Sequence, residues 1–297
     1  MRPVSLVSAL ILVPSLLLPP VGDGHTLEAQ EVGPANGSLV VVGGALRDTT
    51  IIRRFLDLAG GAHRPIVVIP TAGGGDDYDE FWPGLAMFHR MGATNVTVLH
   101  TYDPAEADTE AFAEPLKSAA GVWFGGGRQW RLADSYLDTR VHEELWNLLD
   151  RGGVIGGSSA GASIQGSYMV RGDSETNTVM MGDHTVGLGF LKGVGVDQHL
   201  LMRNRQFDMI EVIQAHPELL GIGLDENTAI VVSGDNFQVM GQGYVAIYDA
   251  TATLDSGGLF YFLAPGDRYN MATRQASRPA QRPQPFERVT DTPWGGR

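Results

Sequence analysis

The segment most capable of chemistry is a serine set between closely spaced glycines. Residues 152–163 read GGVIGGSSAGAS, a run of small and apolar residues that leads into a Gly-x-Ser-x-Gly pattern centred on Ser159. Glycines two positions before and after the serine let the backbone turn sharply from strand to helix, which exposes the hydroxyl for attack on a carbonyl. Ser158 is the neighbouring candidate outside this register. A turn that only packs strand against helix is the alternative interpretation.

Backbone N–H groups near this serine are candidates for holding a developing negative oxygen. Ala160 begins the helix expected after the turn, so its N–H and the positive end of the helix dipole are expected to face a bound carbonyl. The segment 125–131, GGGRQWR, follows an apolar strand and lets further N–H groups of Gly126 and Gly127 converge on one point. A flexible turn without this role is the other interpretation of the segment.

A histidine and two carboxylates follow other apolar segments. The run 193–199 ends in Asp197, Gln198 and His199, and on an extended chain Asp197 and His199 share a face. His199 is therefore a candidate general base. The run 219–227 ends in Asp225 and Glu226, either of which could orient an imidazole and stabilise its cationic form.

Strands and helices must alternate to bring these groups together. Apolar runs predict strands at 38–45, 65–70, 95–99 and 121–124, and the segments between them predict helices at 48–58, 81–91 and 104–118. Such alternation is typical of an α/β fold with a doubly wound, mostly parallel sheet and helices on both faces, whose ligands bind beyond the carboxyl ends of the strands. Alternating segments at 238–241, 244–248 and 259–263 predict an antiparallel extension near the C-terminus.

Composition excludes several classes of function. The chain has 297 residues, a formal net charge of −13 and no cysteine. No basic stripe is present that could displace counterions from nucleic acid, so no nucleic-acid partner is expected. The lack of cysteine excludes disulfides, thiol catalysis and cysteine zinc sites.

The two ends differ from the middle of the chain. Residues 1–30 hold an early arginine, an apolar run too short to span a bilayer, and a proline-rich, polar stretch, which is the pattern of a secretory signal peptide. We expect cleavage near Ala29 or Gln30, a secreted or periplasmic protein and no stable membrane span afterwards, with an uncleaved tether as the alternative. Residues 31–270 are predicted to form a single catalytic domain, and 271–297 a mobile tail rich in proline, arginine and glutamine.

Three stretches together resemble a family of serine peptidases, the one that contains cyanophycinase and aspartyl dipeptidase. They are GGSSAGA at 156–162, VDQH at 196–199 with two arginines soon after it, and GIGLDENTA at 221–229. The resemblance extends through GGGRQ at 125–129, covers roughly residues 38–250, and is closer to the cyanophycinase branch.

The resemblance implies a fold like that of class I glutamine amidotransferases and assigns roles to the candidates. Ser159 is the nucleophile, His199 its base and Glu226 the orienting acid, with Asp225 as its rival. Chain order Ser, His, acid differs from that of α/β-hydrolase esterases, which argues against that class. The implied oxyanion hole is Gly126, Gly127 and Ala160, and the implied residues for an aspartyl substrate are Gln129, Asp197, Gln198, Arg203 and Arg205. No cofactor and no metal are expected, and a homodimer is possible.

The implied activity is exopeptidase cleavage of aspartyl peptides, with cyanophycin, a polymer with arginine on every aspartate, as the leading substrate and β-Asp-Arg dipeptides as products. The alternatives are an α- or β-aspartyl dipeptidase and a non-catalytic binding protein of the same fold. Two departures bear on the substrate. Asp208 stands where cyanophycinases carry a third arginine, and Arg128 precedes Gln129 where another residue is usual.

Overall fold

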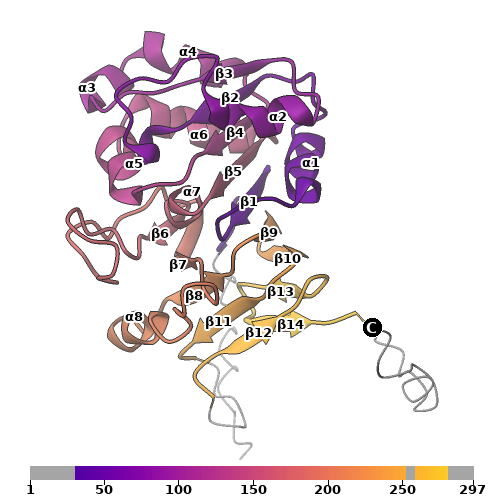
Figure 1. Ribbon diagram of the computed structural model, residues 1–297. Coiled ribbons are helices and arrows are strands. Elements are labelled where there is room, and N and C mark those ends of the chain that lie inside the picture. The colour runs from indigo at the N-terminus through magenta and orange to yellow at the C-terminus, as the bar shows by residue number, and fades with distance from the viewer. Residues whose placement is uncertain (1–30, 252–257, 280–297) are drawn as a thin grey trace, which may run out of the picture. The chain divides into compact units, whose positions relative to one another are not determined.

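The computed structural model describes residues 31–251 and 258–279, and these belong to one compact unit that begins at Glu31. The predicted signal peptide and the predicted tail from residue 280 onward lie outside the described residues. The fold is α/β, as predicted, and the described strands form two sheets (Figure 1). None of the helices in residues 31–251 and 258–279 is long and apolar enough to cross a bilayer.

The larger sheet contains nine of the described strands, and its parallel half carries the predicted Gly-x-Ser-x-Gly turn. The parallel strands, in spatial order, are β1 (Ser38–Val42), β5 (Val154–Ser158), β4 (Gly121–Phe124), β2 (Ile66–Ile69) and β3 (Val96–Val98). Beyond β1 the sheet continues with antiparallel strands, β9 (Thr228–Ser233), β10 (Asn236–Gly241), β13 (Arg268–Asn270) and β14 (Gln275–Ser277). All four residues of β2 and of β4 are buried, as their continuous apolar runs predict.

Helices cover both faces of this parallel half (Figure 1). One face packs against α1 (Thr49–Leu58), the turn η2 (Pro83–Leu85) and α2 (Ala86–Arg90). The other face packs against the turn η1 (Thr71–Gly73), α3 (Pro104–Ala107), α4 (Glu110–Ser118), α5 (Gln129–Tyr136) and α6 (Arg140–Asp150). Asp48 caps α1 by accepting the N–H of Thr50, so this helix begins where the sequence predicts.

The smaller sheet has five strands in the described part of the chain. Their order is β12 (Tyr261–Leu263), β11 (Val245–Asp249), β8 (Leu220–Leu224), β7 (Leu191–Gln198) and β6 (Gly166–Tyr168). Strands β6, β7 and β8 are parallel to one another, β11 pairs antiparallel with β8, and β12 pairs antiparallel with β11. The short helix α7 (Ala160–Ser163) follows β5, and α8 (Met209–Ala215) packs on β8 and β11. The sequence predicted one extended sheet, and β7 and β8 instead lie in this second one.

The two sheets share one apolar core. Val41 of β1, Val194 of β7 and Ile222 of β8 are fully buried in the same cluster. The residues that follow β5, β7 and β8 meet at the end of β1, where the N–H groups of Ser159, His199 and Asn227 donate to the chain. Strand β14 pairs with β13 and extends the sheet past residue 270, where the sequence placed the end of the domain. This part of the predicted tail is folded onto the sheet.

Candidate active site

Ser159 occupies a strained turn between β5 and α7. Its backbone has φ 58° and ψ −113°, a conformation that non-glycine residues rarely adopt. A Cβ added to Gly157 would lie 2.2 Å from the carbonyl oxygen of Gly161, and one added to Gly161 would lie 2.4 Å from that of Phe124. Both glycines are therefore required by close packing of strand and helix, and the turn has the geometry expected of a nucleophile elbow.

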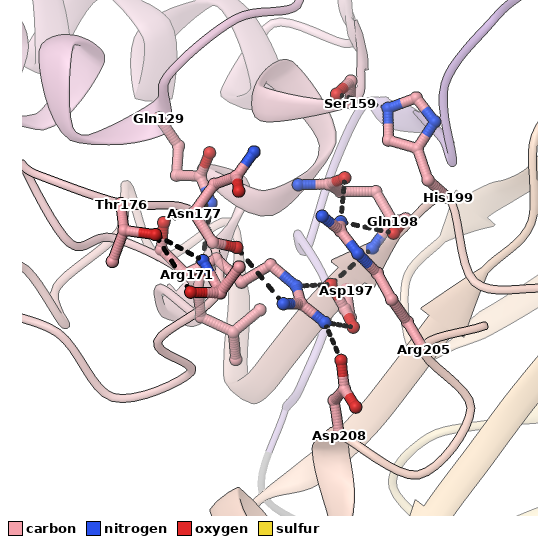
Figure 2. A network of polar contacts seen from close by, with 12 residues as sticks. Gln129, Ser159, Arg171, Thr176, Asn177, Asp197, Gln198, His199, Arg205 and Asp208 are labelled. Atoms are coloured by element: carbon pink, nitrogen blue, oxygen red, sulfur yellow. Dashed lines mark hydrogen bonds and ion pairs between the residues drawn. The ribbon is translucent and has the colours of Figure 1, made fainter. Parts of the chain in front are cut away.

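The serine hydroxyl, an imidazole and a carboxylate lie in one line of hydrogen bonds. Ser159 Oγ is 2.9 Å from Nε2 of His199, and Nδ1 of His199 is 2.6 Å from Oε1 of Glu226. Figure 2 shows the side chains of Ser159 and His199 next to each other. Because the carboxylate accepts at Nδ1, the neutral ring presents an unprotonated Nε2 to the hydroxyl. The arrangement can take a proton from Ser159 as the oxygen attacks.

The end of β1 holds all three segments in place. The carbonyl oxygen of Val42 accepts the N–H of Ser159 at 2.9 Å, and that of Gly43 accepts the N–H of His199 at 2.8 Å. The next carbonyl, of Gly44, accepts the N–H of Asn227, the residue after Glu226, at 2.8 Å. Three consecutive carbonyls thus fix the spacing of residues that come from both sheets.

The charge state of His199 suits a general base. Burial lowers its pKa below the ordinary value of 6.5, and the nearby positive charge of Arg203 acts in the same direction, while the hydrogen bond to Glu226 opposes the shift. The imidazole is therefore neutral near pH 7 and can accept a proton at Nε2.

Asp225, the rival acid, has a different partner. Its Oδ1 accepts the N–H groups of Leu201 and Met202, both at 3.0 Å, in the loop that follows His199. Asp225 therefore fixes the loop after β7, and Glu226 contacts the imidazole. The side chain of Glu226 is 20% exposed, whereas that of His199 is 8% exposed.

Backbone N–H groups without an acceptor among the described residues lie in the loop after β4 and at the start of α7. The N–H of Gly125 donates to Ile69 and that of Arg128 donates to Ala72, which holds the loop at both ends. Among the described residues, none accepts a hydrogen bond from the N–H of Gly126, Gly127 or Ala160. A Cβ at Gly126 would lie 3.3 Å from the Cβ of Ser159, so the loop is in direct contact with the serine. These donors can stabilise an oxyanion.

An apolar cavity of about 230 Å³ opens beside this loop. Gly126 and Ser158 line it, together with aromatic and aliphatic side chains that include Trp82 just before η2, Met87 of α2 and Trp123 of β4. The cavity thus borders the glycine loop and the residue that precedes Ser159 in the chain.

Gly44 leaves room for the ring of His199. A Cβ at Gly44 would lie 2.3 Å from Cε1 of the ring, and the backbone φ of +122° also excludes other residues. We expect Gly44→Ala to displace the ring and lower kcat about 100-fold, the scale of a 1 Å misplacement. Steady-state kinetics check this, with Gly152→Ala as control, because Gly152 also has positive φ but nothing within 4 Å. Equal activity of the two variants would contradict the assigned role of this glycine.

The residues predicted to bind substrate fall into two groups, and Figure 2 labels four of them, Gln129, Asp197, Gln198 and Arg205. Arg203 is exposed, and Arg205 is 8% exposed and donates from Nη1 to the backbone oxygen and Oε1 of Gln198. Gln129 and Asp197 are buried and engaged within the chain. Gln129 donates from Nε2 to the carbonyls of residues 170 and 171, and Asp197 is fully buried in an ion pair. The amide nitrogen of Gln129 and the carboxylate of Asp197 are therefore not free to contact substrate.

Arg171 is the partner of Asp197 and was not predicted from the sequence. It is 2% exposed, although it lies in the segment 167–189, which has no clear periodicity. Charge is the feature of the sequence that could have identified Arg171. Asp197 lies close to the proposed base, and a buried aspartate requires a cation close by.

Comparison with known proteins identifies the family of this chain. The model of peptidase family S51 matches residues 39–240. A cyanophycinase of Geminocystis herdmanii is 33% identical over 264 residues, which cover 80% of this chain and 95% of that protein. A cyanophycinase of Trichormus variabilis is 34% identical over 242 residues, 77% of this chain and 79% of that protein.

A solved structure is similar as well. The crystal structure of a peptidase from an acI-B1 Actinobacterium has a TM-score of 0.59 and 25% sequence identity, and the match covers 82% of this chain and 98% of that one. The family model covers more than half of the chain, and the cyanophycinases exceed 30% identity over most of it. The chain therefore belongs to peptidase family S51 and is a serine peptidase.

Proposed function

We propose that the protein is an exported serine exopeptidase for aspartyl peptides, with cyanophycin as its leading substrate and β-Asp-Arg dipeptides as products. The observation that carries the proposal is the hydrogen-bonded line from Ser159 through His199 to Glu226, with arginines on the next loop. The cyanophycinase relatives support the choice of polymer. The signal-like residues 1–30 support export to the periplasm or the medium.

The proposed reaction is acyl transfer through Ser159. His199 removes the hydroxyl proton at Nε2 as Oγ attacks the peptide carbonyl, and Glu226 stabilises the imidazolium that forms. The N–H of Ala160 and that of Gly126 or Gly127 hold the oxyanion. His199 then gives its proton to the leaving amine, and the acyl group stays on Oγ as an ester. Water, deprotonated by His199, attacks this ester and releases the acid.

The arginines after β7 account for the aspartyl preference in this proposal. Arg203 is exposed and Arg205 is held by Gln198, so their guanidinium groups can pair with a substrate carboxylate. The charge that Arg203 adds near His199 also keeps the pKa of the imidazole low. A carboxylate bound there would raise that pKa and so strengthen the base in the complex.

A second candidate is an α- or β-aspartyl dipeptidase, and one contact favours it. Both oxygens of Asp197 are engaged by Arg171, so this acid has no free oxygen for an arginine of the substrate. An enzyme that recognises only the aspartyl part would need no such contact.

Substrate release decides between the two candidates. The purified protein is given cyanophycin, Asp-X dipeptides with α and β linkage, and Ala-X dipeptides as a control without the carboxylate. We expect release of β-Asp-Arg from cyanophycin and no turnover of Ala-X, as measured by liquid chromatography and mass spectrometry. Turnover of Asp-X without any arginine-containing product from the polymer would replace the first candidate by the second. Rapid turnover of Ala-X would contradict aspartyl recognition altogether.

A further inference from the structure

A buried ion cluster lies beside the residues proposed to bind substrate (Figure 2). Arg171 donates from Nε to Oδ1 of Asp197 at 2.7 Å and from Nη2 to Oδ2 of the same residue at 3.0 Å. Nη2 also reaches Oδ2 of Asp208 at 2.6 Å, and Nη1 donates to the carbonyl oxygen of Asn177 at 3.2 Å. The cluster holds two carboxylates and one guanidinium.

The cluster is charged and its members depend on one another. Burial disfavours the charge on Arg171, but the hydrogen bonds and negative charges of Asp197 and Asp208 outweigh it, and its pKa stays above the usual value. Asp197 is fully buried, whereas the side chain of Asp208 is 39% exposed. Removing the guanidinium would leave Asp197 as an uncompensated buried charge, the costliest change to such a pair.

The segment that follows β6 and carries Arg171 is held in place by Arg128 and Gln129. Gln129 donates to the carbonyls of Val170 and Arg171 at 2.8 and 2.9 Å, and Arg128 donates to those of Asp173 and Thr176 at 2.6 and 2.9 Å. Arg171 itself has a left-handed backbone, with φ 55°. These contacts on both sides hold a strained residue in one position, so its side chain meets Asp197 in a defined geometry.

The cluster is also connected by hydrogen bonds to Arg205, one of the residues proposed to bind substrate. Asp197 Oδ1 accepts the N–H of Gln198 at 2.9 Å, and Gln198 in turn accepts from Arg205 through its backbone oxygen and Oε1. Asp197 is two residues before His199 on the same strand end. A shift of Asp197 would therefore move the group that holds Arg205, while the contact between Ser159 and His199 is fixed separately by β1.

We propose that Arg171 is a positioning residue, and that its pair with Asp208 holds Asp197, Gln198 and Arg205 in the geometry that binds the substrate carboxylate. This inference rests on the proposed function. Position 208 then serves the framework and does not contact substrate. An arginine at 208 would serve equally well if an acid stood at 171, because the cluster would keep one cation and two anions. The departure from the cyanophycinase pattern at Asp208 therefore does not remove the proposed activity on cyanophycin.

Charge reversal tests the role. Arg171→Glu, Asp208→Arg and the double variant are compared on the aspartyl substrate that the wild type turns over, with competent sites counted by fluorophosphonate titration. Each single reversal places like charges together, and we expect kcat/KM to fall at least 100-fold. The double variant is expected to recover to within about tenfold of the wild type. A double variant no better than the worse single variant would overturn the pairing.

Milder variants separate positioning from general stability. Asp208→Asn weakens one charged hydrogen bond, and we expect KM to rise about tenfold with kcat within twofold and an unchanged rate of fluorophosphonate labelling. Asp208→Glu keeps the carboxylate and should restore KM. Arg140→Gln, which removes the ion pair to buried Glu144 on α6, is the control and should leave KM unchanged. These variants carry the test if Arg171→Glu fails to fold.

The outcomes distinguish the two proposals. If the wild type is active and Asp208→Asn leaves KM unaltered, the positioning role is rejected and the proposed function stands. This holds whether or not kcat and the melting temperature of the variant fall. A wild type that turns over no aspartyl peptide rejects the proposed function and the positioning role together.

Discussion

Replacing Ser159 by alanine is expected to lower kcat by on the order of 10^4-fold or more, with little change in KM. The hydroxyl is the group that attacks in the proposed reaction, and no other hydroxyl in the described residues bonds to His199. The residual rate would come from the backbone donors and from substrate binding, which the substitution leaves intact. Steady-state kinetics on the best aspartyl substrate, at equal concentrations of folded protein, measure the effect.

Ser158→Ala is the matched control for this variant. Ser158 is the last residue of β5 and differs from Ser159 by one position, but its side chain takes no part in the hydrogen-bonded line. We expect its kcat to stay within a few-fold of the wild type. If Ser159→Ala kept more than about 1% of wild-type turnover while Ser158→Ala did not, the assignment of the nucleophile would be wrong.

Glu226→Gln is expected to lower kcat by up to about 10^4-fold, the effect of the corresponding change in a serine-protease triad. The amide preserves the size of the side chain but cannot stabilise an imidazolium, and it allows the ring to adopt the wrong tautomer. Asp225→Asn is the control, since Asp225 caps the N–H groups of Leu201 and Met202 and does not touch the ring. It should mainly lower the melting temperature, with kcat within about tenfold of the wild type.

The pH profile of Glu226→Gln gives a second readout. The hydrogen bond that His199 donates to Glu226 raises the pKa of His199, so its loss should lower that pKa further. Activity requires the neutral ring and falls as pH drops below the pKa, so the acid limb of kcat/KM should move to lower pH in the variant. A larger loss of kcat in Asp225→Asn than in Glu226→Gln would assign the orienting acid to Asp225.

Much of the site was predictable because each candidate follows a continuous apolar run. Buried parallel strands read as such runs, and ligand groups collect at their carboxyl ends, so Ser159, His199 and the pair Asp225 and Glu226 could be named as candidates from the sequence. The choice of Glu226 over Asp225 came from the family resemblance. The separation into two sheets was not predictable. An apolar run such as 193–196 indicates a buried strand but does not specify which strand lies beside it, since pairing depends on contacts distant in sequence.

The substrate side was less predictable, for a related reason. The family resemblance implied that Asp197 contacts substrate, but Asp197 is fully buried and paired. Its partner, Arg171, lies 26 residues earlier in a segment without periodicity. Sequence spacing gave no indication that Arg171 and Asp208 meet, and only the fold brings them together.

The central claim is that Ser159 is a nucleophile activated by His199. The most direct measurement is peptide mapping by mass spectrometry after brief treatment with a fluorophosphonate probe. We expect a single adduct, on Ser159, with labelling abolished in Ser159→Ala and strongly slowed in His199→Ala. An unlabelled wild type, or an adduct on another residue that forms equally well in Ser159→Ala, would contradict the claim.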